Sequence, residues 1–309
     1  MAVVIAASTV FHYSLLQEDR KETSDSNIPL QNARSESANL LLYKSSIGAD
    51  EARGLLAEHQ ELEELTIVEC HALEGLACSE QLARSLKKLT VHDSPVGDSI
   101  ETFVARCGKL ESLSLKNCCV SSHALGKLRL PESLSRFSIS GLPFNDTAFE
   151  KLATCPNLEN LSLERCAVSD RGVVAVMPKL NVDRVSLSGS LVSDACVGGI
   201  SECESLSSVS VGFTLITSAG VVQLCKNENI STLDLSGIPL DSKAIHALAS
   251  MPRLDLLIAR KCHLTEAEIL RILSESSSIS SIWLDYGDIT PRSEERIRGA
   301  FPDVALQVR

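Results

Sequence analysis

A hydrophobic pattern that recurs every 24 residues constrains the fold of this 309-residue chain more than any other feature. Mostly Leu, Val or Ile occupies its first, fourth and sixth positions, as in Leu110, Leu113 and Leu115. Full copies begin at residues 62, 86, 110, 134, 158, 182, 206, 230, 254 and 279. A degenerate copy begins near residue 37, and a partial one lies near Val304. This periodicity predicts an array of similar units, each packed against its neighbours.

Each unit contains the signals of one strand and one helix. The fourth and sixth positions share one face of a short strand, because side chains alternate along a strand. A residue type that caps helix N-termini follows in eight units: Ser121, Asn145, Ser169, Ser193, Thr217, Asp241, Thr265 and Thr290. Thr265 with Glu268 has the pattern of a capping box. We therefore expect strands centred near residues 41, 66, 90, 114, 138, 162, 186, 210, 234, 258 and 283, each followed by a helix except at the ends.

One such unit cannot bury its apolar face alone, so neighbouring units must stack around a shared core. The predicted fold class is α/β: a curved solenoid with parallel strands on its concave face and short helices on its convex face. Leu113 and Leu161 are expected in the core, so a charge at either position should unfold a block of repeats.

The repeat resembles that of leucine-rich repeat proteins, whose pattern Leu-x-x-Leu-x-Leu-x-x-(Cys/Ser/Thr)-x-(Val/Ile/Leu) it follows. The turn Val-Ser-Asp-x-Gly-Val at residues 168–173 is similar to the 24-residue repeats of many bacterial members, and the cysteines are similar to those of eukaryotic F-box proteins. The resemblance implies a horseshoe-shaped domain of about 11 repeats over residues 37–309.

Residues 1–36 stand outside the repeats. Ala2 to Leu16 are mostly apolar, and a polar stretch follows, which predicts a short hydrophobic segment and a tether that proteolysis would remove. One hypothesis is a truncated membrane anchor or export signal, although no positive residues precede the apolar segment. The alternative is a frayed end or a capping strand. The compartment stays open between cytoplasmic and membrane-tethered, and a membrane is expected as a partner only through this segment.

The eleven cysteines follow the repeat rather than a disulfide or metal pattern. One set is Cys70, Cys118, Cys166 and Cys262, and another is Cys107, Cys155 and Cys203. Members of a set lie two or more repeats apart, about 10 Å at the usual strand spacing, which is too far for a disulfide. We expect free, buried thiols, no metal site, and a duplicated unit of two repeats.

Composition and motif searches narrow the function. With 40 acidic against 29 basic residues, the chain has a net charge of −11, which disfavours nucleic acid as a partner. No pattern for a nucleophile elbow, a zinc protease helix, a P-loop or a dinucleotide site occurs, so we expect a non-enzyme without a cofactor. The prediction is an interaction scaffold that binds a protein on its concave face. The alternative is a substrate-recognition subunit of a ubiquitin ligase, as the F-box resemblance implies, but residues 1–36 are too short and polar for its recruitment module.

The outward strand positions indicate where a partner would bind. They form a row of hydroxyl residues that changes at its C-terminal end: Thr66, Thr90, Ser114, Ser138, Ser162, Ser186, Ser210, Asp234, Ile258 and Trp283. Aromatic and Arg side chains dominate binding hot spots. The predicted partner-binding residues are therefore Phe213, Asp234, Arg260, Lys261, Trp283, Asp285 and Tyr286. The alternative is that Trp283 and Tyr286 shield the core near the C-terminal cap.

Overall fold

The computed structural model describes residues 33–36, 38–43, 49–58, 61–70, 76 and 79–308. All of them belong to one compact unit, Asn32–Arg309. The predicted hydrophobic segment and the tether as far as residue 32 lie outside the described residues. Among the helices that are described, none has the length and apolar character needed to cross a bilayer.

One sheet runs through the described residues, and its strands lie side by side in chain order. The strands are β1 (Ala33–Glu36), β2 (Asn39–Tyr43), β3 (Glu64–Val68), β4 (Lys88–His92), β5 (Ser112–Lys116), β6 (Arg136–Ser140), β7 (Asn160–Glu164), β8 (Arg184–Ser186), β9 (Ser208–Ser210), β10 (Thr232–Asp234), β11 (Leu256–Ile258), β12 (Ser281–Leu284) and β13 (Ala305–Val308). The predicted strand centres all fall within β2 to β12 and are confirmed. The sequence pattern did not predict β1, which pairs with β2 in antiparallel orientation.

The register of the sheet carries the repeat from strand to strand. Leu89 pairs with Leu113, and Leu113 pairs in turn with Phe137. Each buried residue therefore stacks on the equivalent residue of the next unit, and the inward side chains form one continuous core. Leu113 and Leu161 are 1% and 2% exposed, as predicted.

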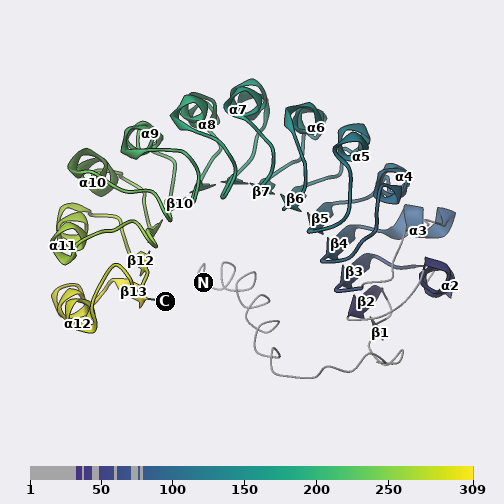
Figure 1. Cartoon of the computed structure of the whole chain (residues 1–309), viewed down its shortest axis with the longest axis horizontal. Helices are drawn as coiled ribbons and strands as arrows, with labels where there is room; N and C mark the ends of the chain where they lie inside the picture. Colours follow the sequence, from purple (N-terminus) through teal and green to yellow (C-terminus); the bar gives the residue numbers. More distant parts are fainter. Residues whose placement is uncertain are drawn as a thin grey trace. The chain divides into compact units, whose positions relative to one another are not determined.

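Short helices return the chain from each strand to the next and lie on the outer side of the arc that residues 33–308 form (Figure 1). They are α2 (Ala49–Glu58), α3 (Glu80–Ser85), α4 (Ser99–Arg106), α5 (Ser122–Lys127), α6 (Asp146–Phe149), α7 (Asp170–Val176), α8 (Val197–Ser201), α9 (Ser218–Leu224), α10 (Ser242–Ala249), α11 (Glu266–Glu275) and α12 (Pro291–Ala300). Short 3₁₀ segments adjoin α6, α7 and α8. The strands line the inner side of the arc, which confirms the predicted horseshoe.

The predicted capping residues begin their helices or 3₁₀ segments, and seven of the eight accept a backbone N–H there: Ser121, Asn145, Ser193, Thr217, Asp241, Thr265 and Thr290. The capping box of Thr265 and Glu268 is present. Ser169 occupies the cap position without this bond. Its hydroxyl instead donates to Asp146 at 2.6 Å.

That hydroxyl belongs to a ladder of carboxylates that ties successive helices together. Four aspartates each accept both the backbone N–H and the hydroxyl of the cap residue in the next unit, at 2.6–2.8 Å. The pairs are Asp98 with Ser121, Asp146 with Ser169, Asp170 with Ser193 and Asp194 with Thr217. Charge-assisted hydrogen bonds of this kind are stronger than neutral ones. The ladder therefore links neighbouring units on the helical side, as the sheet does on the concave side.

The ten described cysteines are free thiols, and eight of them are buried. In the first set, Cys118 donates its thiol to the carbonyl oxygens of Val91 and Lys116. Burial raises the pKa of Cys118 to about 11 and that of Cys166 to about 12. Because the thiolate is the reactive form, these thiols act as packing groups at neutral pH.

A second feature repeats every two units. The residue after the strand has a positive φ in unit after unit, and from Asn117 onward a residue with a side chain alternates with glycine: Asn117, Gly141, Arg165, Gly189, Phe213, Gly237 and Lys261. The side chains of Asn117, Arg165 and Phe213 each lie over the next glycine. A Cβ at Gly189 would lie 2.8 Å from Arg165 Cγ, and one at Gly237 would lie 2.6 Å from Phe213 Cδ1. From Asn117 to Gly237 the unit of packing is therefore a pair of repeats.

Candidate functional site

The outward row on the concave face changes character between β9 and β12. Ser114, Ser138, Ser162, Ser186 and Ser210 are register partners in a continuous line across β5 to β9. The same line continues through Asp234, Ile258 and Trp283 on β10, β11 and β12. An acidic, an aliphatic and an aromatic side chain thus follow a stretch of small hydroxyl groups.

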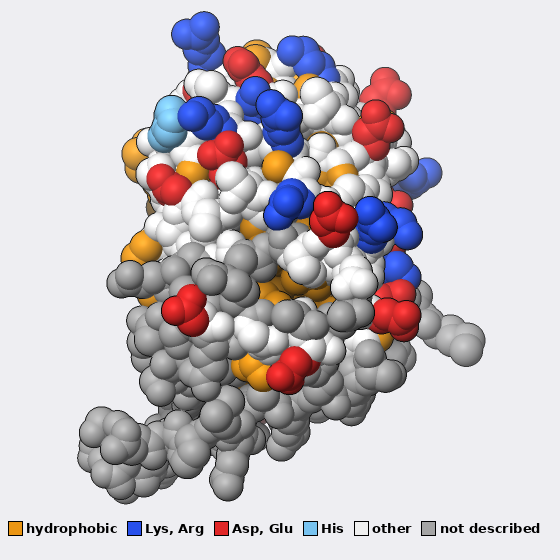
Figure 2. Space-filling view, turned by 90° about the vertical axis from the view of Figure 1, so that its right-hand side faces the viewer, with side chains coloured by type: hydrophobic (Ala, Val, Ile, Leu, Met, Phe, Trp, Pro, Cys, Tyr) orange, Lys and Arg blue, Asp and Glu red, His pale blue; other side chains and the backbone are white. Residues whose placement is uncertain are grey.

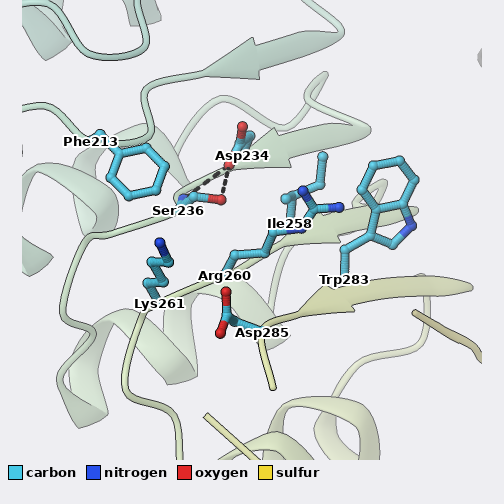
Figure 3. A pocket seen from close by; sticks show the side chains of 8 residues that line it. All are labelled: Phe213, Asp234, Ser236, Ile258, Arg260, Lys261, Trp283 and Asp285. Atoms are coloured by element: carbon cyan, nitrogen blue, oxygen red, sulfur yellow. Dashed lines mark hydrogen bonds between the residues drawn. The ribbon is translucent and has the colours of Figure 1, made fainter. Parts of the chain in front are cut away.

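A pocket of about 370 Å³ opens at this point. Its lining residues, shown in Figure 3, are Phe213, Asp234, Ser236, Ile258, Arg260, Lys261, Trp283 and Asp285. The structure therefore brings six of the seven predicted binding residues into one pocket. Tyr286 is not among them, and it is 65% exposed.

Two lining residues were not among the predicted ones. Ile258 belongs to the outward row, but aliphatic residues are common in strands, so its residue type alone did not indicate a binding role. Ser236 follows β10 in the sequence Asp-Leu-Ser, and a carboxylate two residues before a serine is a common turn signal that could have indicated it. Ser236 is buried and forms part of the floor of the pocket.

The carboxylate of Asp234 accepts three hydrogen bonds from neighbouring groups. Oδ1 accepts the backbone N–H of Ser236 at 3.0 Å and its hydroxyl at 2.7 Å. Oδ2 accepts the hydroxyl of Ser210, the residue before it in the outward row, at 2.9 Å. These bonds fix Asp234 and leave it little capacity to bind a further donor.

Arg260 and Trp283 form the wall of the pocket on the β12 side. The guanidinium carbon of Arg260 lies 5.2 Å from the centre of the Trp283 ring, within the range of a cation–π interaction. Trp283 is half-buried and is not part of the buried core. Its ring therefore packs against the cation on the concave side, where Figure 3 shows Arg260 extended toward it.

Phe213 and Lys261 form the opposite wall. Phe213 is 56% exposed, and its ring lies over Gly237, where a side chain would collide with it. Lys261 Nζ lies 6.0 Å from the centre of this ring. The backbone N–H of Lys261 donates to Asp288 at 2.8 Å, which holds the turn after β11 in place.

Charged groups at the other end of the concave sheet are paired with one another. Lys87 Nζ lies 2.8 Å from Glu63 Oε1, and Lys88 Nζ lies 3.1 Å from Glu64 Oε2. The hydrogen bond with Glu63 raises the pKa of Lys87. Figure 2 looks at the side of the molecule toward the first repeats and shows Lys and Arg beside Asp and Glu rather than a large area of one sign.

The described residues contain no group of three His, Cys, Asp or Glu side chains placed to hold a metal ion. The pocket itself combines two aromatic rings, two cations and two carboxylates in an open hollow on a rigid sheet. Such a combination suits recognition of a complementary surface group.

Comparison with solved structures shows what this architecture is similar to. An internalin (InlF) from Listeria monocytogenes str. 4b F2365 aligns with a TM-score of 0.51 and 11% identity, over 88% of this chain and 82% of that chain. The plant peptide hormone receptor RGFR1, in complex with RGF2, aligns with a TM-score of 0.42 and 15% identity, over 73% of this chain and 41% of that chain. No protein-family model matches the sequence, and no curated protein matches it either. The fold is a leucine-rich-repeat solenoid, as the repeat pattern predicted.

Proposed function

We propose, starting from the leucine-rich-repeat fold of this chain, that it is a non-catalytic interaction scaffold that binds a protein partner on its concave face. The binding surface is centred on the pocket between β10 and β12, and Phe213, Arg260 and Trp283 are its main contact residues. Tyr286 lies outside the pocket and belongs to the rim of this surface.

One observation carries the proposal: the exposed Phe213, the half-buried Trp283 and two basic side chains line the pocket that also interrupts the hydroxyl row. Exposed apolar surface with a polar rim often marks a protein interaction site or a ligand-binding groove. Aromatic and Arg side chains in a partly enclosed hollow supply most of the binding energy in protein interfaces. The acidic net charge of −11 favours a protein over a nucleic acid as the partner.

Site-specific photo-crosslinking in the source cells tests the proposal. A photoreactive amino acid at Gln307, the register neighbour of Trp283, probes the edge of the pocket without removing a lining residue. The same amino acid at the exposed Lys151, in the 3₁₀ segment after α6, serves as the matched control on the helical side.

The expected result is a discrete adduct with one protein from Gln307, which is absent from Lys151 and is reduced by Trp283→Ala. Adducts of equal pattern at both positions, or none at Gln307, would contradict a concave binding surface.

A further inference from the structure

We infer that the pocket binds the carboxylate side chain of an acidic, partly apolar segment of the protein partner, with Arg260 as the residue that receives it. This inference rests on the proposed function and names the chemistry of the partner. The pocket contains two cations and two carboxylates. The inference follows from a difference in their hydrogen-bond partners: the carboxylates have donors within the chain, whereas the cations have no acceptor among the described residues.

The two carboxylates already have hydrogen-bond donors from the chain. Asp234 accepts three hydrogen bonds from Ser210 and Ser236. Asp285 Oδ1 accepts the backbone N–H of Gly287 at 2.8 Å. The oxygens of both carboxylates therefore already have donors from the chain, although each carboxylate keeps its negative charge.

The two cations are in the opposite condition. Within the part of the chain that the structure describes, the side chains of Arg260 and Lys261 form no ion pair and no hydrogen bond, and both lie against aromatic rings. A cation–π contact uses none of the N–H groups as hydrogen-bond donors, so they remain available to a ligand. Arg260 Nε is buried without an acceptor, so the terminal Nη1 and Nη2 groups are the donors that a ligand can reach.

The contact with Trp283 also reduces the cost of binding. An arginine that is free in solution loses side-chain entropy when it grips a ligand, and one that is already held by a ring loses less. The planar fork of an arginine matches a carboxylate, which it can bind through two parallel hydrogen bonds. The pocket thus presents a pre-positioned carboxylate receptor.

The same pocket disfavours a group of higher charge. Asp234 and Asp285 lie on its lining, and their repulsion grows with the charge of the ligand. A carboxylate carries one negative charge, whereas a phosphorylated side chain carries almost two at neutral pH. Ile258 and the Trp283 ring supply apolar contact for a neighbouring side chain. A Glu or Asp beside an aromatic or aliphatic residue fits these walls.

Titration calorimetry on the full chain tests this with short synthetic peptides. The probe repeats Ser-Glu-Phe and is acetylated and amidated, so that only its side chains are charged. One matched peptide has Gln in place of Glu, and another has phosphoserine in place of Glu. The variants are Arg260→Gln for the receptor and Arg165→Gln as control, since Arg165 already donates to Ser140 at 3.2 Å on the same sheet edge.

We expect the Glu peptide to bind, and to bind about tenfold more tightly than the Gln peptide, since a charge-assisted bidentate pair is lost in the latter. The phosphoserine peptide should not bind more tightly than the Glu peptide. Arg260→Gln should remove the preference for Glu while the circular dichroism spectrum and the melting temperature stay as in the parent. Arg165→Gln should leave the preference unchanged.

The inference is overturned if the Glu peptide does not bind, if Gln and Glu peptides bind equally, if phosphoserine is preferred, or if Arg260→Gln keeps the preference for Glu. These results leave the crosslinking from Gln307 unaffected. If crosslinking from Gln307 persists but the peptides show no preference for Glu, the concave face binds its partner without a carboxylate. If crosslinking from Gln307 is absent, the proposed function itself is wrong.

Discussion

The two ends of the concave sheet each present a pair of adjacent basic residues, but they use them in different ways. Lys87 and Lys88 near β4 are paired with Glu63 and Glu64 of the preceding unit. Arg260 and Lys261 after β11 lie against aromatic rings and have no carboxylate within ion-pair distance in the described structure. The two lysines therefore form ion pairs within the protein, whereas Arg260 and Lys261 are available to bind a ligand.

This contrast occurs on one backbone. Both ends share the same strand register, the same buried positions and the same helical layer. The inward residues therefore specify the solenoid, and the outward residues vary almost independently of it. A binding site can arise at one end because changes on the outward face cost little folding free energy.

The largest effect should come from the buried face that both ends share. Leu161→Asp places a charge at a position that is 2% exposed, and an unpaired buried charge costs several kcal/mol. Thermal melting should show the loss of a block of repeats. Ser162→Asp, on the next residue of β7 but facing outward, is the control and should melt close to the parent. Equal melting of both variants would contradict the assignment of the inward face.

The second-largest effect should be on partner affinity, and it should differ between the two ends of the concave sheet. Trp283→Ala removes the ring that Arg260 contacts, and we expect partner affinity to fall by roughly 2 kcal/mol with little change in melting temperature. Thr90→Ala changes the same outward position at the other end of the row and should alter neither quantity. A strong fall in melting temperature for Trp283→Ala, with capture by the folded fraction unchanged, would assign the ring to the cap instead.

A smaller effect should come from the carboxylate ladder at α4. The hydrogen bonds from Ser121 lower the pKa of Asp98 below its ordinary value of 3.8. Because the pKa of Asp98 is lower in the folded than in the unfolded protein, its carboxylate contributes fully to the free energy of unfolding above the unfolded pKa. This contribution is lost as the pH falls through the folded pKa. Asp98→Ala should therefore lower the melting temperature near neutral pH, and the difference from the parent should shrink in strong acid. Asp303→Ala removes an exposed charge outside the ladder and should show no such convergence.

The smallest effect should be seen at the paired lysines. Lys88→Gln breaks an exposed ion pair, and such pairs contribute up to about 1 kcal/mol, less at high salt. Chemical denaturation should show a loss of this size that salt abolishes. Arg260→Gln should show no loss that salt abolishes, because it breaks no ion pair of the described residues. A salt-dependent loss at Arg260 as large as that at Lys88 would mean that Arg260 does have an ion-pair partner within the chain.

The local spacing of residues predicted most of the fold. Strand centres and caps depend on neighbours within a single unit, so Leu113 or Thr265 could be assigned from the pattern alone. The ladder from Asp98 to Ser121 connects side chains of different units, and the pattern within one unit does not contain it. Likewise, the placement of Phe213 depends on the absence of a side chain at Gly237, and the burial of Ser236 depends on the path of the chain after β10. The residue types predicted the region of the candidate site. Which side chains form the walls of the pocket could be known only from the way the units stack in three dimensions.

The alternation of glycine with larger residues after the strands has a consequence for how such a chain can lengthen or shorten during evolution. Loss of one unit would bring Arg165 and Phe213, or Phe213 and Lys261, into successive units without the glycine between them. Loss of two units would restore the same order of neighbours. Between Asn117 and Lys261, a gain or loss of paired repeats is therefore the change that keeps each large side chain over a glycine. Where two side chains do follow one another at this position, they must fit each other, as Asp93 and Asn117 do through a hydrogen bond of 2.8 Å.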